Sequence, residues 1–443
     1  MSISFSEALS RTPLRAFSVA TFAVCMLVLV CDGIDAQLLG IVAPKVIADF
    51  GVDRGTFGVA MSAALVGFGI GSWAGGWLGD TVGRRWSLAL ATLVFSLATI
   101  GASTAGGVWD MAAWRMLGGL GFGSAYANAI ALAGEWLPDR WRPVGVTTLS
   151  VGTPAGGFVV AALAPTLIDA HGWRGTFVVL GLATLLVIVL VVAVLRDSPS
   201  FLLARGKAEA ARIAARRVLV GDPELAPERG DASGAAVGVL HRSNLRLNVG
   251  IGLSFTAAAL VAYSILSWTT TMLTAQGFSF EEAAYAVSVG GITSVIASVA
   301  AGFLAQWIGT RRLVLGISAT LFVSLVWLGW VIETMPEVPP AGTQWLVVAL
   351  VGLTAAIFSA GMATMYAIMT HAYPPSCRSA GIGFGIFMGR VGAVAATAFG
   401  GWLLDLGQGS VIPFFAVIAA GALLFSAAAF VVDRHVPPAM RKI

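Results

Sequence analysis

Long apolar segments dominate this chain of 443 residues, and twelve of them are long enough to cross a lipid bilayer. A helix needs about 20 apolar residues to span a hydrocarbon core of roughly 30 Å. In lipid each span must satisfy its own backbone hydrogen bonds, which favours helices. The sequence therefore predicts an all-α membrane protein. Its predicted spans are 16–39, 57–78, 86–105, 111–134, 144–168, 177–195, 248–273, 283–308, 313–332, 345–372, 379–404 and 411–432.

The composition excludes several other classes of protein. Charged residues make up 11% of the chain, whereas soluble proteins carry about 25%, so polar side chains are too few to cover a soluble protein of this length. The net charge of +4, with basic residues in short scattered clusters, excludes a nucleic-acid partner. Three cysteines form no disulfide framework, and four histidines show no metal-ligand spacing. We therefore expect no metal and no cofactor.

Lysine and arginine lie mostly on one side of the predicted spans. If the N-terminus is inside, 21 of the 26 fall on that side, three fall outside and two lie within spans. Cytoplasmic loops carry an excess of these residues. We expect a multi-pass protein of the cell (inner) membrane with both termini in the cytoplasm.

One polar stretch, 196–246, divides the spans six and six. We therefore predict an N-terminal six-helix bundle over 1–195, a cytoplasmic linker over 196–246 and a C-terminal six-helix bundle over 247–443. The linker contains a predicted amphipathic helix with basic residues on one side, which we expect at the cytoplasmic surface in contact with lipid head groups. Its apolar face is formed by Leu203, Ala211, Ala214 and Val218.

A degenerate repeat relates the two halves. GGWLGDTVGRR at 75–85 aligns with AGFLAQWIGTR at 301–311, and EWLPDRWRPVG at 135–145 aligns with HAYPPSCRSAG at 371–381. Such repeats are typical of transporters whose halves rock about a central site. No HExxH or nucleophile-elbow motif indicates an enzyme. The sequence therefore predicts a transporter that works by alternating access.

Only four Asp, Glu, Lys or Arg residues fall within the spans, and such residues are usually functional. Asp32 and Asp35 share one face of the first span, and Arg115 lies at a similar depth. Arg115 can pair with one aspartate, either as a permanent salt bridge or as part of a proton-coupling site. Repulsion between the two carboxylates favours protonation of one of them. The sequence does not choose between Asp32 and Asp35 as the proton carrier.

The fourth charge, Arg390, lies near the middle of its span, and the spans of the C-terminal half hold no acidic partner for it. A carboxylate substrate would compensate it bidentately, although backbone carbonyls and water are an alternative. Aromatic and polar side chains at a similar depth are candidate substrate contacts, although packing explains each of them as well. An outer aromatic belt is a further alternative for the tryptophan. These candidates are Tyr126, Asn128, Tyr263, Trp268 and Tyr366.

Two motifs carry a resemblance to a known family. GGWLGDTVGRR resembles the loop signature G-x-x-x-D-x-x-G-R-R of the major facilitator superfamily, and RDSPSFLL at 196–203 is similar to the end of that family's sixth helix. DGIDAQLLGIVAPKV in the first span resembles the D-G-x-D opening of the aromatic acid:proton symporters. Ala127 stands where that group usually has proline.

This resemblance implies a fold of two pseudo-symmetric six-helix bundles. It also implies proton-coupled import of a small aromatic carboxylate of the benzoate or hydroxybenzoate type by a monomer, with protons and a small organic anion as partners. In the family the loop is a conformational latch, so Asp80 should dock on the start of the eleventh helix. The residues that match the signature are Gly76, Asp80, Gly83, Arg84 and Arg85.

Two other functions remain open at this point. A non-aromatic organic acid would use the same arginine. A proton-antiporting efflux protein for drugs or metabolites would have the same fold, and GTPAGG at 152–157 faintly resembles the antiporter motif. Import and export would depend oppositely on the pH gradient.

Overall fold

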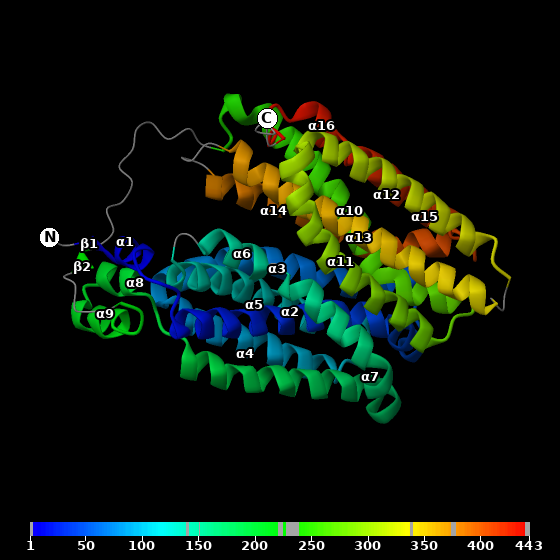
Figure 1. Cartoon of the computed structure of the whole chain (residues 1–443). Helices are drawn as coiled ribbons and strands as arrows, with labels where there is room; N and C mark the ends of the chain where they lie inside the picture. The colour runs from blue at the N-terminus through cyan, green and yellow to red at the C-terminus, as the bar shows by residue number, and fades with distance from the viewer. Residues whose placement is uncertain are drawn as a thin grey trace.

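The computed structural model describes residues 3–138, 141–149, 151–219, 225–226, 239–336, 340–373 and 378–438, and nearly all of this part is helical (Figure 1). The all-α prediction is confirmed. Helices of the N-terminal half are α2 (Ala16–Phe50), α3 (Arg54–Val82), α4 (Arg84–Ala102), α5 (Val108–Trp136), α6 (Arg142–Leu149) and α7 (Gly152–Val194). Those of the C-terminal half are α10 (Leu245–Ala275), α11 (Phe280–Ile308), α12 (Thr310–Glu333), α13 (Ala341–Ala372), α14 (Arg378–Leu406), α15 (Ile412–Leu424) and α16 (Ala427–Val431).

Eleven helical stretches among the described residues are long and apolar enough to cross a membrane, against twelve predicted spans. The difference lies in α7, which holds the fifth and sixth predicted spans. Gly172 interrupts α7 with a φ of 66° and a ψ of 176°, so the chain turns there and two helices follow one another. A residue with a side chain would be strained at this positive φ. The twelve-span fold is therefore consistent with the eleven helical stretches.

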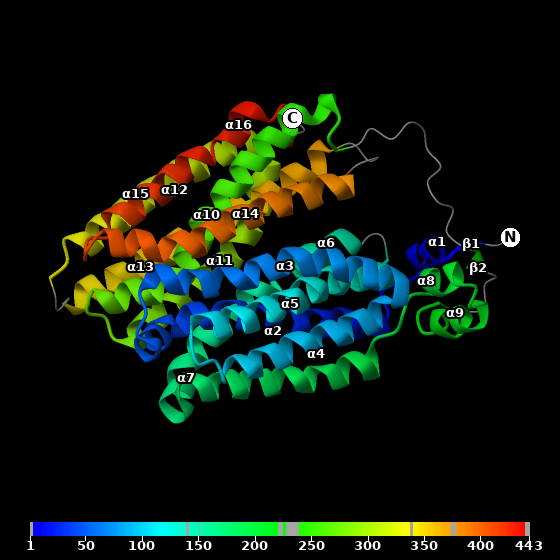
Figure 2. The same cartoon turned by 180° about the vertical axis from the view of Figure 1, so that it is seen from behind.

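Both chain ends lie at one end of the molecule, which we call the linker end. The 3₁₀ turn η1 (Arg242–Asn244) leads into α10 there, and the backbone of Thr310 donates a hydrogen bond to Val436 near the C-terminus. The opposite end, where α3 begins and α14 ends, is called the far end. The two bundles converge toward the far end, as views from both sides show (Figures 1 and 2).

Three helix pairs join the two halves: α3 with α14, α2 with α10, and α7 with α11. Their contacts are close at the far end, where the Thr270 hydroxyl donates to the Gly40 carbonyl at 2.6 Å. A Cβ added to Gly58 would lie 2.7 Å from the Ala398 carbonyl oxygen. Small residues at such interfaces let helix backbones approach closely.

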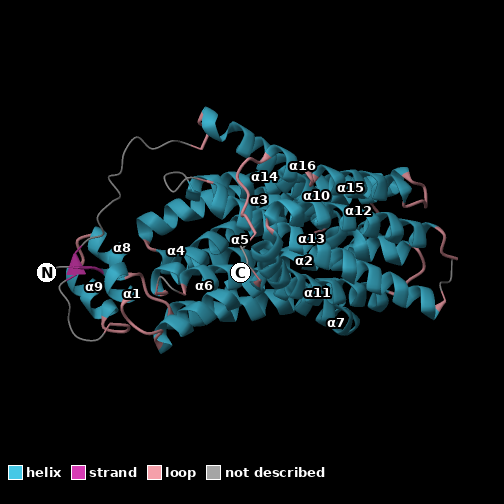
Figure 3. Cartoon of the chain, turned by 45° about the horizontal axis from the view of Figure 1, so that its top comes forward, coloured by secondary structure: helices cyan, strands magenta, loops and turns pink. Residues whose placement is uncertain are grey.

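The linker folds back onto the N-terminal segment. β1 (Ile3–Ser4) pairs in parallel with β2 (Leu225–Ala226), and Figure 3 shows this pair beside the N-terminus. The short helices α1 (Phe5–Ser10), α8 (Pro199–Ala204) and α9 (Ala208–Ala215) lie next to it.

The predicted amphipathic helix corresponds to α8, α9 and the turn after them. Ala211, Ala214 and Val218 are buried, and the last two belong to the same apolar cluster as Phe5 and Leu9 of α1. The apolar face is therefore covered by protein rather than by lipid. The predicted contact with lipid head groups therefore concerns the exposed basic side.

Glycine packing inside the N-terminal half gives a test of this fold. A Cβ at Gly71 of α3 would lie 2.1 Å from the Leu120 carbonyl of α5, whereas one at Gly69 of the same helix meets no atom within 4 Å. We expect Gly71→Ala to lower the free energy of unfolding by about 1–3 kcal/mol, as overpacking does, and Gly69→Ala to leave it near the wild-type value. Thermal unfolding of the purified protein in detergent measures both. Equal melting temperatures for the two variants would contradict the packing of α3 against α5.

Candidate functional site

Arg390 lies about midway along α14 and contacts both halves of the molecule. Its Nη1 donates to the Tyr263 hydroxyl of α10 at 2.8 Å. Its Cζ lies 3.7 Å from the centre of the Phe68 ring of α3, a cation–π distance. Among the described residues, no carboxylate lies within ion-pair distance of Arg390, and no hydrogen-bond acceptor is found for its Nε and Nη2. The Nε and Nη2 groups of Arg390 are therefore available as hydrogen-bond donors to a ligand.

Two further phenols lie in the electrostatic surroundings of Arg390: Tyr126 of α5 and Tyr366 of α13. The Tyr126 ring lies 5.8 Å from Phe68, and the Tyr366 ring lies 5.4 Å from Phe255, measured between ring centres. The structure therefore brings together four predicted residues: Arg390, Tyr126, Tyr263 and Tyr366.

Sequence reasoning missed Phe68. It lies in a glycine-rich span and follows no polar or charged pattern, so its sequence context is that of an ordinary packing residue. Only the tertiary structure places its ring on the guanidinium of Arg390.

Asp32 lies at the same interface between halves and has no ion pair among the described residues. It is 2% exposed, and its Oδ2 accepts a hydrogen bond of 3.2 Å from the Thr153 hydroxyl of α7. Asp32 and Arg390 interact electrostatically across the two halves. Gly33 allows this arrangement, because a Cβ there would lie 2.0 Å from the Thr153 carbonyl oxygen. The glycine of D-G-x-D thus lets α7 approach Asp32.

Asp35 has a different environment, although it lies one helical turn away. Arg115 of α5 makes an ion pair with its carboxylate and donates a second hydrogen bond to its backbone carbonyl at 3.0 Å. The Thr99 hydroxyl of α4 donates to its Oδ1 at 2.6 Å. Both charges of this pair are about 3% exposed. Asp35 is therefore fully compensated within the N-terminal half, whereas Asp32 is not.

Two of the predicted substrate contacts lie in helix packing instead. The Asn128 amide donates to the Gly75 carbonyl of α3 and to the Ser87 hydroxyl of α4, both at 2.9 Å. Two residues along a helix differ by about 200°, so Asn128 and Tyr126 lie on opposite sides of α5.

Trp268 of α10 is fully buried, and its Nε1 donates to the Ala396 carbonyl of α14 at 3.3 Å. An aromatic-belt position facing lipid is therefore wrong for Trp268, because helix packing removes its ring from the surface.

The loop signature forms a charge cluster at the linker end. Arg84 contacts Asp80 at 3.1 Å and Glu135 at 2.5 Å, while the Arg85 amide donates to Asp197 at 3.0 Å. Gly83 has a φ of 113°, and a Cβ there would lie 2.8 Å from the Asp197 carboxylate.

The remaining signature residues, Gly76 and Asp80, are not closely packed. Gly76 has no atom within 4 Å of an added Cβ, and the Asp80 side chain is 67% exposed. The predicted docking of Asp80 on the start of the eleventh helix falls on residues 374–377 and on the side chains of 378–380, which lie outside the described residues. That docking stays a prediction.

No group of three or more His, Cys, Asp or Glu side chains that could hold a metal ion occurs in the described part of the chain. The chemistry available at the central site is therefore that of one guanidinium, three phenols, one uncompensated carboxylate and the ring of Phe68.

The sequence matches the model of the Major Facilitator Superfamily over residues 25–338 and 251–442. It is 28% identical over 416 residues to the gallate transporter of Pseudomonas putida, covering 92% of this chain and 90% of that protein. It is also 28% identical over 415 residues to the 4-hydroxybenzoate transporter PcaK of Pseudomonas aeruginosa, covering 90% and 89%.

Solved structures share the fold at low identity. A crystal structure of a D-xylose–proton symporter superposes with a TM-score of 0.74 at 16% identity, covering 96% of this chain and 99% of that chain. A bacterial homologue of the lysosomal transporter Spinster, in an inward-facing conformation, gives a TM-score of 0.68 at 14% identity, covering 95% of each chain.

The two aspartates should respond differently to neutralisation. Asp35→Asn leaves the buried Arg115 without a counter-charge, and breaking a buried ion pair from one side costs about 3–5 kcal/mol. Asp32→Asn removes no ion pair, so we expect its unfolding to stay close to that of the wild type. Thermal unfolding in detergent compares the two variants, and Asp35→Leu combined with Arg115→Leu should recover part of the loss. A larger loss for Asp32→Asn than for Asp35→Asn would contradict these environments.

Proposed function

The chain belongs to the major facilitator superfamily, and on that premise we propose that it imports a small aromatic carboxylate together with a proton. Family and relatives are transporters, so the chain is a multi-pass membrane transporter rather than an enzyme. The substrate class is inferred from Arg390, a cation at mid-membrane depth that has hydrogen-bond donors without a partner among the described residues and aromatic neighbours. Relatives named for gallate and 4-hydroxybenzoate, both aromatic carboxylates, support the same class.

The carboxylate of the substrate binds the open Nε and Nη2 of Arg390 bidentately. Guanidinium and carboxylate match in this geometry, which is stronger and more specific than a point contact. Tyr263 holds the guanidinium through its remaining edge, and Phe68 covers one of its faces. The substrate must therefore approach in the plane of the guanidinium, with its ring toward Tyr126 and Tyr366.

Asp32 is the proton-binding residue in this proposal. Asp35 is already neutralised by Arg115, which leaves Asp32 as the carboxylate whose charge can change without breaking an ion pair. Ionised Asp32 partly compensates Arg390 across the interface. Protonation removes that compensation and favours binding of the substrate anion instead. One proton per monovalent anion makes the cycle electroneutral, so the pH gradient alone drives it.

Alternating access follows from the two bundles, which rock about the central site. The excess of lysine and arginine favours a cytoplasmic linker end and an external far end. In this conformation the halves are joined at the far end, which supports a site that opens toward the cytoplasm. We propose that a monomer carries out the whole cycle in the cell (inner) membrane.

Transport in proteoliposomes tests the role of Arg390. With an acidic exterior we expect saturable uptake of labelled 4-hydroxybenzoate, and we expect Arg390→Gln to raise KM by at least about tenfold. Tyr263→Phe removes one hydrogen bond of Arg390 and should raise KM by about fivefold. Tyr285→Phe is the matched control, because Tyr285 is 50% exposed and pairs with Trp345 away from the site.

Unchanged KM in Arg390→Gln would overturn the carboxylate-binding role. Uptake of aliphatic but not aromatic acids would overturn the substrate class. Accumulation driven by an acidic interior rather than an acidic exterior would indicate export.

Proton coupling is tested at Asp32. An asparagine mimics the protonated carboxyl group, so Asp32→Asn should lose accumulation driven by the pH gradient while retaining exchange of labelled for unlabelled substrate. We expect that exchange to lose its pH dependence as well. Parallel uptake and exchange assays on the same vesicles measure both quantities. Gradient-driven accumulation by Asp32→Asn at the wild-type level would exclude Asp32 as the proton carrier.

A further inference from the structure

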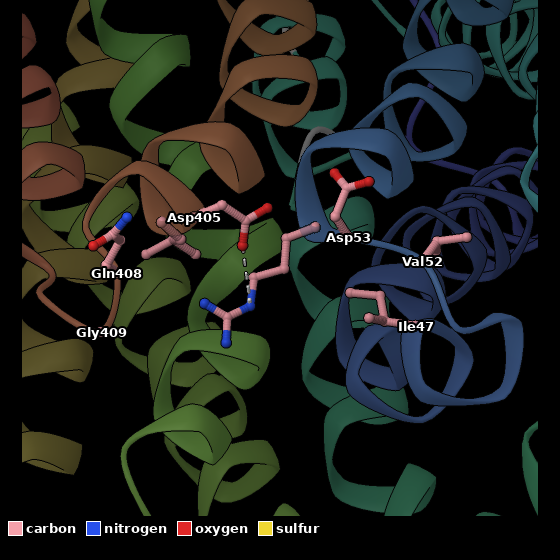
Figure 4. A pocket seen from close by; sticks show the side chains of 8 residues that line it. Ile47, Val52, Asp53, Asp405, Gln408 and Gly409 are labelled. Atoms are coloured by element: carbon pink, nitrogen blue, oxygen red, sulfur yellow. Dashed lines mark ion pairs between the residues drawn. The ribbon is translucent and has the colours of Figure 1, made fainter.

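Asp405 connects the two halves at the far end. It is the second-last residue of α14, and its Oδ2 accepts a hydrogen bond of 3.1 Å from the backbone amide of Gly55 in the first turn of α3. Its Oδ1 lies 3.9 Å from Nε of Arg54. Figure 4 shows this ion pair beside a cavity of about 310 Å³. A carboxylate of one half thus binds the positive N-terminal end of a helix in the other half.

The amide hydrogen bond matters more than the ion pair. Arg54 and Asp405 are 29% and 36% exposed, and exposed ion pairs at such distances contribute little. A carboxylate bound to a backbone amide at a helix N-terminus makes a charge-assisted hydrogen bond, which is stronger.

α3 also has an N-cap from its own half. Asp53 already caps this helix from within the N-terminal half, accepting from the Thr56 amide at 2.7 Å and from the Thr56 hydroxyl at 2.5 Å. These hydrogen bonds lower the pKa of the Asp53 carboxyl. The contact of Asp405 is therefore additional to the cap by Asp53, and unlike that cap it joins the two halves.

Backbone packing beside Asp405 shows how close this approach is. A Cβ added to Gly401 of α14 would lie 2.2 Å from the carbonyl oxygen of Arg54. Together with the contact of Gly58 with Ala398, this puts the backbones of α3 and α14 in direct contact beside the cavity. The halves must separate here before a molecule can pass from this side.

The same two helices carry a second acid at the linker end. Asp80 lies two residues before the end of α3, as Asp405 lies one residue before the end of α14. In this conformation the ion-pair partner of the Asp80 carboxylate, within the described part of the chain, is Arg84. Each helix has 29 residues and is roughly 43 Å long, so the two acids lie at opposite ends of one rigid pair.

We infer that Asp405 is a further residue of the transport cycle: it latches the far end closed by capping α3, as the counterpart of Asp80 at the linker end. The inference rests on the proposed rocking of the halves. Because both helices are rigid, closing one end opens the other, and the two latches stabilise opposite conformations. Their relative strength sets the resting population.

Distances between spin labels at the far end test the latch without any substrate. Cysteines replacing Thr104, after α4, and Thr334, after α12, place one exposed label in each half, in a background with the native cysteines replaced. Double electron–electron resonance then gives the ratio of closed to open far ends. We expect Asp405→Ala to lower this ratio about tenfold, as loss of a charge-assisted hydrogen bond does.

Asp53→Ala is the matched control, because it removes a carboxylate from the same turn but none that joins the halves. We expect it to lower the melting temperature and to leave the distance ratio unchanged. Asp80→Ala should raise the ratio of closed to open far ends, and the double variant with Asp405→Ala should return toward the wild type.

A second variant keeps the test valid if Asp405→Ala folds poorly. Gly401→Ala forces the same backbones apart and should also favour the open far end, whereas Gly383→Ala, with open space on the same helix, should not.

An unchanged ratio in well-folded Asp405→Ala, or an equal shift in Asp53→Ala, overturns the latch. A single distance in all variants, Asp80→Ala included, shows instead that the halves do not rock, which is a failure of the proposed function. Shifted distances with no aromatic acid transported leave the latch standing and overturn only the substrate.

Discussion

A guanidinium held at mid-membrane depth is the constraint on which the rest of this structure depends. An arginine at the centre of a membrane helix costs about 2.5–3.5 kcal/mol on insertion scales and cannot lose its charge. The membrane spans of its own half provide Arg390 with the phenols of Tyr263 and Tyr366 but no carboxylate. The other half adds the ring of Phe68, the phenol of Tyr126 and the more distant charge of Asp32. The two bundles are therefore joined electrostatically at the place where we propose that a carboxylate binds.

Two aspartates three residues apart have opposite environments for a geometric reason. α2 packs against α7 and α5, and Thr99 of α4 also reaches it. Asp35 faces Arg115 and Thr99, which neutralise it, while Asp32 faces α7 and receives a single hydroxyl. A proton-coupling site needs one carboxylate that can gain and lose a proton, surrounded by charged groups whose protonation stays fixed. The paired Asp35 and Arg115 hold the helices that position Asp32.

Contact between the halves at the far end depends on how closely their backbones approach. Lipid offers no hydrophobic drive for helix association, so close contact through small residues and hydrogen bonds takes its place. Gly58 and Gly401 bring α3 and α14 together, and Asp405 adds a hydrogen bond to an amide 350 residues away in the chain. These contacts add to a buried apolar cluster that includes residues of both halves. In the rocking that we propose, they would be broken and remade.

The sequence by itself determined the spans, their division into halves and the few charges that matter, because lipid imposes rules that act locally. Each span must be long, apolar and helical, and each charge within it stands out. The same rules suggested a pair between Arg115 and one aspartate. Three tyrosines were among the five candidate substrate contacts expected at a depth similar to that of Arg390. Only the tertiary structure decided which aspartate is paired, because that depends on the rotation of α2 against three neighbours. It also decided that Asn128 and Trp268 serve helix packing, that Phe68 covers Arg390, and that Asp405 caps α3. These contacts join segments far apart in the chain, and the periodicity of a single helix carries no information about which helix it will face.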